Sequence, residues 1–296
     1  MSEAKKRRRR FGDRKEGRKL RTISPMLKFV PYIMPRRSDA LNYFADKLDI
    51  TEAEKICREQ VKKGNKNFSL LHVILAAYVR TVSQKPELNR FVSGQKVYSR
   101  NNIEVVMTIK KKMTIDAEDT CIKVCFEPTD TIEDVYRKFN AVVEENVKES
   151  EDKSSFEKVN KILTFIPGLL CRWTVKCLNF LDYFGLLPKF LLKVSPFHGS
   201  MIITSMGSLG IKPVYHHIYD FGNLPLFISY GAKQSVNKID DDGNVKKERY
   251  IDMKVVMDER ICDGYYYASC FKMLKKLFEK PQCLYNPPEN VFEDVD

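Results

Sequence analysis

Residues 258–264 have the sequence Asp258-Glu259-Arg260-Ile261-Cys262-Asp263-Gly264 and separate two different hydrophobic patterns. Before them, every second residue from Ile251 to Met257 is apolar, which is the pattern of a half-buried strand. After them, apolar residues recur at helical spacing before Pro281, at Ala268, Phe271, Leu274 and Leu277. The stretch is therefore predicted to join a strand to an amphipathic helix, with its charged residues at the junction.

The remaining chain mixes helix and strand patterns without a regular βαβ period, which favours an α+β fold with one main sheet. Thr51 and Glu54 predict a capping box for a helix that ends near Gly64. Ser69 begins a second apolar helix that Pro86 ends, and Thr131 caps a third. Strand patterns occupy residues 97–109, with a turn at Asn101-Asn102, and residues 122–126, 201–205 and 226–230, and a hairpin tip is predicted at 240–244.

Several ordered blocks of the sequence resemble the catalytic domain of the 2-oxo acid dehydrogenase acyltransferases and, more distantly, chloramphenicol acetyltransferase. The family carries H-x-x-x-D-G between a strand and a helix, where this chain has residues 259–264. Other matching blocks are Phe68 to Leu71, Lys85 to Phe91, Val97 to Ile103, Thr204-Ser205-Met206-Gly207 and Leu277 to Pro281. The resemblance spans about residues 37–284 and is interrupted by one insertion.

The resemblance implies a two-layer chloramphenicol acetyltransferase-like sandwich, a mixed sheet with helices packed on it, that assembles as a homotrimer. It also implies that acyl-CoA is a co-substrate and that an acceptor enters from the opposite end of a channel between subunits. Thr204 or Ser205 would supply the oxyanion hydroxyl. Asp263 would fix the loop by pairing with Arg36 or Arg37, and Gly264 would permit the turn into the helix.

Glu259 occupies the position where the family has its catalytic histidine. A glutamate whose pKa is raised by burial could act as the general base. Alternatively, Glu259 forms a salt bridge with Arg260 or another basic residue and the usual chemistry is absent. A histidine from elsewhere could also replace the base: His198 precedes the Thr204 strand, and His216-His217 follow it. Arg260, Arg37, Gly264, His216 and His217 are the candidate substrate-binding residues.

No metal site or bound cofactor is predicted, because the four histidines lack ligand spacing and the eight cysteines form no C-x-x-C pair. The cysteines are interpreted as reduced thiols of a cytoplasmic protein, since no secretory signal or spanning segment is apparent. The roughly 36 residues before the matching region are too few for a lipoyl domain. We therefore expect a stand-alone relative rather than a core subunit of a dehydrogenase complex.

Two further segments lie outside the matching blocks. Residues 1–22 are predicted to form a basic disordered tail, because residues 1–21 contain eleven basic and three acidic residues. About residues 158–194 form an apolar helical insertion in the single domain 23–296, with Arg172, Lys176, Lys189 and Lys193 among its apolar residues. Three interpretations of this insertion stay open: subunit packing, a wall for a long acyl chain, and contact with an anionic membrane surface.

Two functions are compatible with these patterns. The first is an acyltransferase that moves an acyl group from a CoA thioester to an unknown thiol or hydroxyl acceptor. The second is a catalytically inactive oligomeric scaffold of the same fold, associated in one version with the inner membrane surface. Nucleic-acid binding is disfavoured, because most of the excess positive charge lies in the tail and the folded part has no motif for reading bases.

Overall fold

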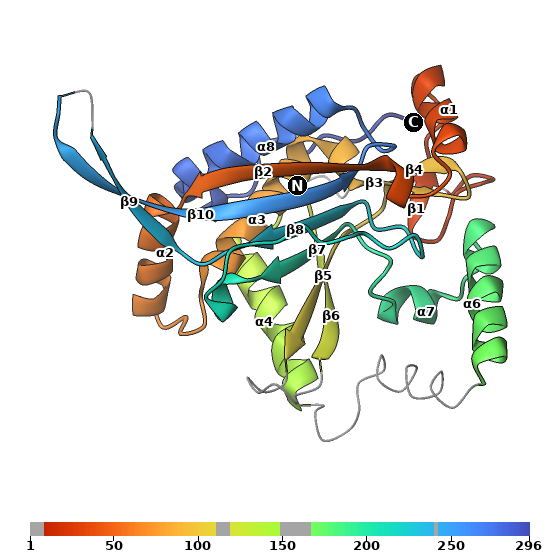
Figure 1. The fold of residues 1–296 in the computed structure, drawn as a ribbon, viewed down its shortest axis with the longest axis horizontal. Helices are drawn as coiled ribbons and strands as arrows, with labels where there is room; N and C mark the ends of the chain where they lie inside the picture. The colour runs from red at the N-terminus through yellow and green to blue at the C-terminus, as the bar shows by residue number, and fades with distance from the viewer. Residues whose placement is uncertain (1–8, 111–118, 149–166, 240–241) are drawn as a thin grey trace.

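The computed structural model describes residues 9–110, 119–148, 167–239 and 242–296. Their main feature is a mixed sheet with the strand order β2-β10-β8-β7-β5-β6, and β9 pairs with β10 outside this path (Figure 1). β7 runs parallel to β5 and β8, whereas the other pairs are antiparallel. The strands of this sheet are β2 (Leu41–Asp49), β5 (Ile103–Lys110), β6 (Asp119–Phe126), β7 (Met201–Ser205), β8 (Leu226–Tyr230), β9 (Gln234–Ile239) and β10 (Val245–Asp258).

Helices cover one face of this sheet and form the main hydrophobic core with it. The central helix, α3, is buried on all sides apart from its last residue, which explains why its sequence is apolar around most of its circumference. The helices of the described residues are α1 (Pro25–Ile33), α2 (Thr51–Lys62), α3 (Leu70–Gln84), α4 (Ile132–Lys148), α6 (Gly168–Tyr183), α7 (Lys189–Val194) and α8 (Gly264–Glu279), with short 3-10 turns at Ser38–Ala40, Pro86–Asn89, Gly207–Leu209 and Pro281–Tyr285. This arrangement confirms the predicted α+β sandwich of a mixed sheet and packed helices.

The opposite face of the sheet carries a smaller apolar cluster. Val106, Ile202 and Val256 contribute from the sheet, and Ile218 and Leu224 contribute from the loop between β7 and β8. Alternate residues of one strand thus enter two different clusters, as the pleat requires: Val105 faces the helices and Val106 faces the loop.

A second, three-stranded sheet corrects the predicted N-terminal tail. β1 (Gly17–Lys19) pairs with β4 (Lys96–Arg100), which pairs with β3 (Arg90–Ser93). Leu20 is buried, and the backbone N–H groups of Arg21 and Thr22 donate to the Asp296 carbonyl. Residues 9–22 are therefore part of the fold, because their basic side chains find carboxylate and carbonyl partners that the sequence pattern does not reveal. Residues 1–8 lie outside the described part of the chain.

Local predictions had mixed outcomes. Asn101-Asn102 does end a strand, and it separates β4 of the small sheet from β5 of the main sheet. Thr131 caps α4, since its hydroxyl accepts from the backbone N–H of Asp134. The capping box at Thr51 is wrong: Asp49 accepts from the Thr51 N–H instead, and the Glu54 carboxylate forms ion pairs with Lys233 and Arg249. The predicted hairpin at 240–244 lies between the paired strands β9 and β10, although residues 240–241 lie outside the described residues.

The apolar insertion contains the helices α6 and α7 in its described part, from residue 167 onward. Pro167 and Pro188 precede the two helices as N-cap residues, and Gly185 between the helices has φ +71°. Residues 158–166 of the predicted insertion lie outside the described residues. Within the described ranges, no helix is both long and apolar enough to cross a membrane.

Candidate functional site

The loop after β10 is held by a buried cluster of charges around Asp258. Asp258 is the last residue of β10, and its carboxylate accepts from Arg260 Nε at 2.8 Å and from Arg260 Nη2 at 2.7 Å. Arg37 Nε lies 3.4 Å from the same carboxylate, and the Arg37 guanidinium also donates to the Tyr219 and Gly222 carbonyls. Burial lowers the pKa of Arg37, and the Asp258 carboxylate opposes that shift. The cluster therefore fixes the β10 end against the β7–β8 loop.

This arrangement corrects the predicted partner of Asp263. Asp263 is exposed and acts as the N-cap of α8, where its carboxylate accepts from the Tyr266 N–H at 2.8 Å. Free N–H groups at a helix start attract such a side chain, whereas Asp258 is the carboxylate beside the arginines. Gly264 is the first residue of α8, and a Cβ added there would meet no atom within 4 Å. Gly264 is also not among the described glycines with positive φ, so the turn into α8 does not require glycine as expected.

Glu259 follows the buried cluster and is only half-buried. Its backbone N–H donates to the Ala40 carbonyl at 2.9 Å, and its carboxylate accepts from Asn42 Nδ2 at 2.6 Å. The expected alternative of a salt bridge to Arg260 is wrong, because the Arg260 guanidinium is bound to Asp258. The carboxylate of Glu259 thus stands at the strand end with a neutral partner and access to solvent.

The candidate oxyanion hydroxyls lie at the other end of the sheet. Thr204 and Ser205 are the last two residues of β7, and both are half-buried. Thr204 lies opposite Ser229, and Ser229 lies opposite Lys254 of β10. Glu259 is five residues further along the chain from Lys254, which is roughly 16 Å at about 3.3 Å per residue. Within one chain, the fold does not bring the Glu259 carboxylate to the hydroxyl pair.

The three candidate histidines also occupy separate positions. His198 is buried beside α6: its Nδ1 lies 2.8 Å from Ser195 Oγ, and its Nε2 lies 3.5 Å from Asp182 Oδ2. His216 stacks on Phe227 at 4.5 Å between ring centroids, and burial lowers its pKa. His217 is exposed and packs edge-on against Tyr219. Neither His198 nor the His216-His217 pair has a described contact with Thr204 or Ser205.

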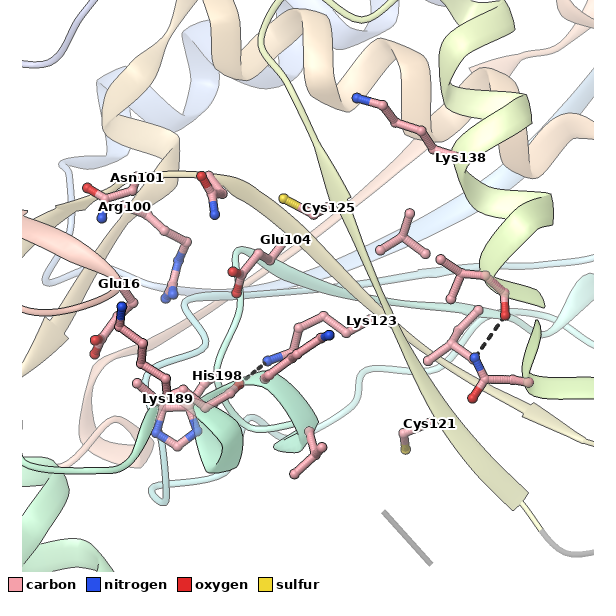
Figure 2. A pocket seen from close by; sticks show the side chains of 18 of the residues that line it. Glu16, Arg100, Asn101, Glu104, Cys121, Lys123, Cys125, Lys138, Lys189 and His198 are labelled. Atoms are coloured by element: carbon pink, nitrogen blue, oxygen red, sulfur yellow. Dashed lines mark hydrogen bonds between the residues drawn. The ribbon is translucent and has the colours of Figure 1, made fainter. Parts of the chain in front are cut away.

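A cavity of about 900 Å³ was not predicted from the sequence. It lies along β6, between α4, α7 and the N-terminal segment, and Figure 2 shows Arg100, Glu104, Glu16 and Lys123 around it. Burial lowers the pKa of Lys123 to about 8, and its amine donates to the Leu192 carbonyl at 2.6 Å. The available signal was the alternation in β6: Ile122 and Val124 enter the core, so Lys123 must face the opposite side.

Arg100 is the most deeply placed cation of this cavity wall. Its side chain is buried, lies over the Phe91 ring at 4.3 Å, and donates through Nη2 to Asn223 Oδ1 at 2.7 Å. Its Nε and Nη1 have no hydrogen-bond partner among the described residues. The nearby carboxylates of Glu104 and Glu16 favour its charged form, although burial lowers its pKa. The cavity therefore has a mixed charge, with cations and carboxylates facing each other.

The chain has the fold of the acyltransferase catalytic domains that are related to chloramphenicol acetyltransferase. The probable dihydrolipoamide acetyltransferase of Listeria monocytogenes 4b F2365 is similar with a TM-score of 0.56 and 15% identity, over 89% of this chain and 95% of that one. The dihydrolipoamide acetyltransferase of Azotobacter vinelandii is similar with a TM-score of 0.57 and 13% identity, over 89% of this chain and 93% of that one. A chloramphenicol acetyltransferase is similar with a TM-score of 0.52 and 10% identity, over 85% of this chain and 93% of that one.

These likenesses are structural. No family model matches the sequence, and no curated protein matches it. At such low identities the similarity extends to the fold and leaves the chemistry to be argued from the residues of this chain.

Proposed function

We propose that this protein transfers an acyl group from a CoA thioester to a thiol or hydroxyl acceptor. The observation that carries the proposal is the fold, which is shared with acyltransferases over most of both chains. The half-buried Glu259 carboxylate next to the end of β10 is the candidate base, and the arginines that bind the preceding Asp258 fix the strand end beside it. Arg37 and Arg260 are positioning residues in this proposal, because both are buried against Asp258 and neighbouring carbonyls.

The active cleft is proposed to form between copies of the chain. Because Glu259 and the hydroxyls of Thr204 and Ser205 lie at opposite ends of the sheet, one chain cannot bring them to the same substrate. A closed ring that sets the β10 end of one copy against the β7 end of the next would unite them. A homotrimer with acyl-CoA and the acceptor between subunits fits this requirement, and a cytoplasmic location gives access to CoA thioesters.

The reaction would use these residues in two ways. The Glu259 carboxylate takes the proton from the acceptor O–H or S–H, and the acceptor atom attacks the thioester carbonyl carbon. The Thr204 or Ser205 hydroxyl of the neighbouring copy donates to the resulting oxyanion. The carbon–sulfur bond then breaks, and the proton passes from the base to the departing CoA thiolate. Exclusion of water by a second copy favours such chemistry, since desolvation makes carboxylates in general better bases.

A panel of CoA thioesters with thiol and hydroxyl acceptors tests the proposal. Glu259→Gln should lower the transfer rate by roughly 10²- to 10⁴-fold, the usual contribution of a general base. Glu279→Gln, at the exposed end of α8, is the matched control and should leave the rate unchanged. Activity that survives Glu259→Gln would remove this residue from the mechanism.

The second candidate is an oligomeric scaffold without catalysis. It is favoured by the Asn42 hydrogen bond to Glu259, since an amide donor stabilises a carboxylate as an acceptor and does not relay its proton. In that case no acyl-CoA should bind in a calorimetric titration, and Thr204→Ala should change stability alone. Calorimetry with acetyl-CoA and with CoA separates the two functions before any acceptor is known.

A further inference from the structure

The helix α6 presents an unusual surface, because many of its large apolar side chains are exposed. Asp182 is its single buried residue. Half-buried residues on one side, such as Leu178 and Leu181, face the body of the molecule. The outer face of α6 consists of large exposed apolar side chains, and the exposed C-cap residue Phe184 continues it: Leu169, Leu170, Trp173, Phe180 and Phe184. A water-facing helix ordinarily carries polar residues in these positions.

The charges around this outer face all have one sign. Arg172 and Lys176 are exposed beside it, and the Lys176 amine lies 5.4 Å from the centre of the Trp173 ring. Asp182, the only acidic residue of α6, is buried and bound to Arg14, so it does not neutralise them. The face therefore combines aromatic and aliphatic side chains with cations at its border.

A second helix at the same end of the molecule has the same character. Figure 1 places α1 at the upper right and α6 at the lower right, both on the side of the molecule away from the β9–β10 hairpin. The exposed residues of α1 include Met26, Phe29 and Ile33, which recur at helical spacing, and Lys28 is exposed among them. No acidic residue occurs between Thr22 and Arg37. One end of the protein thus carries two apolar helix faces with basic borders.

We propose that this end of the molecule, formed by the outer face of α6 and by α1, docks onto an anionic membrane surface. Amphipathic helices with aromatic residues and a cationic border lie in the plane of the lipid interface. Their apolar side chains enter the headgroup boundary, and Arg172, Lys176 and Lys28 attract anionic headgroups. The proposal is independent of the acyl-transfer function.

A bilayer fits this face better than a second copy of the chain does. An isologous contact would set the outer face of α6 against itself and would bring two cationic borders together without any carboxylate between them. Anionic lipid supplies the missing negative charge, and a bilayer accepts the separated helices α1 and α6 at once. The charge pattern therefore favours lipid over an isologous contact with a second copy, and the proposed ring contact uses the strand ends of β10 and β7 instead of this face.

Trp173 makes the proposal directly testable, because it is the only tryptophan of the chain. Its side chain is 68% exposed in the free protein. Phosphatidylcholine vesicles that contain 30% phosphatidylglycerol should shift its fluorescence to the blue, and brominated lipid should quench it. The full-length protein should co-sediment with these vesicles, and at least tenfold less well with pure phosphatidylcholine or in high salt.

Two variants locate the binding surface. Phe180→Glu should reduce vesicle binding at least tenfold, whereas Ile239→Glu should not, because Ile239 is also exposed but ends β9 on the opposite side of the molecule. Circular dichroism checks that both variants are folded. Unchanged fluorescence with anionic vesicles would overturn the proposal, as would equal binding by Phe180→Glu. A blue shift that depends on protein concentration without lipid would also overturn it, since the face would then be covered by a second copy.

Discussion

Asp258 and Asp263 lie five residues apart, at and after the end of β10. Because their surroundings differ, replacing each with alanine should lower the free energy of unfolding by a different amount. Asp258→Ala leaves Arg37 and Arg260 buried without their carboxylate, which should lower the free energy of unfolding by about 3–5 kcal/mol. Asp263→Ala removes an exposed N-cap and should cost only about 1 kcal/mol. Urea denaturation of both variants measures the difference. Equal losses would contradict the assignment of Asp258 as the residue that anchors the loop.

His72 should make the stability of the fold depend on pH. Burial lowers its pKa to about 4 from an ordinary value of 6.5. Its Nδ1 accepts a hydrogen bond from the Ser69 N–H, so this ring nitrogen is unprotonated in the folded protein. As the pH falls through 6.5, the unfolded chain binds a proton that the folded chain refuses until about pH 4. The free energy of unfolding should therefore decrease over that window, by up to about 3 kcal/mol.

Denaturation at pH 7 and pH 4.5 compares the wild-type protein with His72→Leu. The leucine variant is less stable at pH 7 because it loses the cap, but its stability should depend less on pH. His217→Leu removes an exposed histidine and should keep the wild-type dependence. The same pH dependence in His72→Leu as in the wild type would show that another group is responsible.

The helix α6 is attached to the protein mainly through its C-terminal end, where Arg14 is buried. The Arg14 guanidinium lies 3.1 Å from Asp182 Oδ1 and donates to the Tyr183 carbonyl at 2.8 Å. Arg14→Ala should cost about 3 kcal/mol, because it leaves the Asp182 carboxylate buried without this cation. Hydrogen exchange of the α6 amides should accelerate in this variant.

An exposed arginine ion pair provides the matched control for Arg14. Arg137 lies 2.6 Å from Asp134 on the surface of α4, and exposed pairs of this kind contribute little to stability. Arg137→Ala should therefore change the free energy of unfolding by less than about 0.5 kcal/mol and leave the exchange of α6 unaltered. A loss as large as that of Arg14→Ala would mean that burial does not decide the effect.

The elements that sequence patterns predicted well are those whose signals are local. The helix after Ser69 and the strand before Asp258 follow from periodicity, because each buries one continuous set of side chains. Partners distant in the sequence were missed. Arg14 finds Asp182, Arg18 finds the C-terminal carbonyls, and Arg37 finds Asp258 rather than Asp263. Charge counting along the chain cannot reveal such pairs, so the basic N-terminal segment was predicted to be disordered.

The candidate site also shows that sequence patterns do not reveal which distant residues lie close together in space. The order of the sequence blocks identified Glu259, Thr204 and Ser205 as one group, and strand register separates them within the chain. Periodicity predicts which residues face a core, but it does not specify which strand ends meet. The proposed arrangement of several copies would bring these groups together, and it is the part of the proposal that the register makes necessary.

Mixing two inactive variants tests whether the site is shared between copies. Glu259→Gln lacks the base, and the double variant Thr204→Ala with Ser205→Ala lacks the hydroxyls, so each should be inactive alone. After the two are unfolded and refolded together, random assembly should give sites with both native groups in about a quarter of the interfaces. The acyl-transfer rate should recover to about that fraction of the wild-type rate, as a steady-state assay with CoA thioester would show. Refolding each variant alone is the control, and activity that stays absent in the mixture would contradict a site built by neighbouring chains.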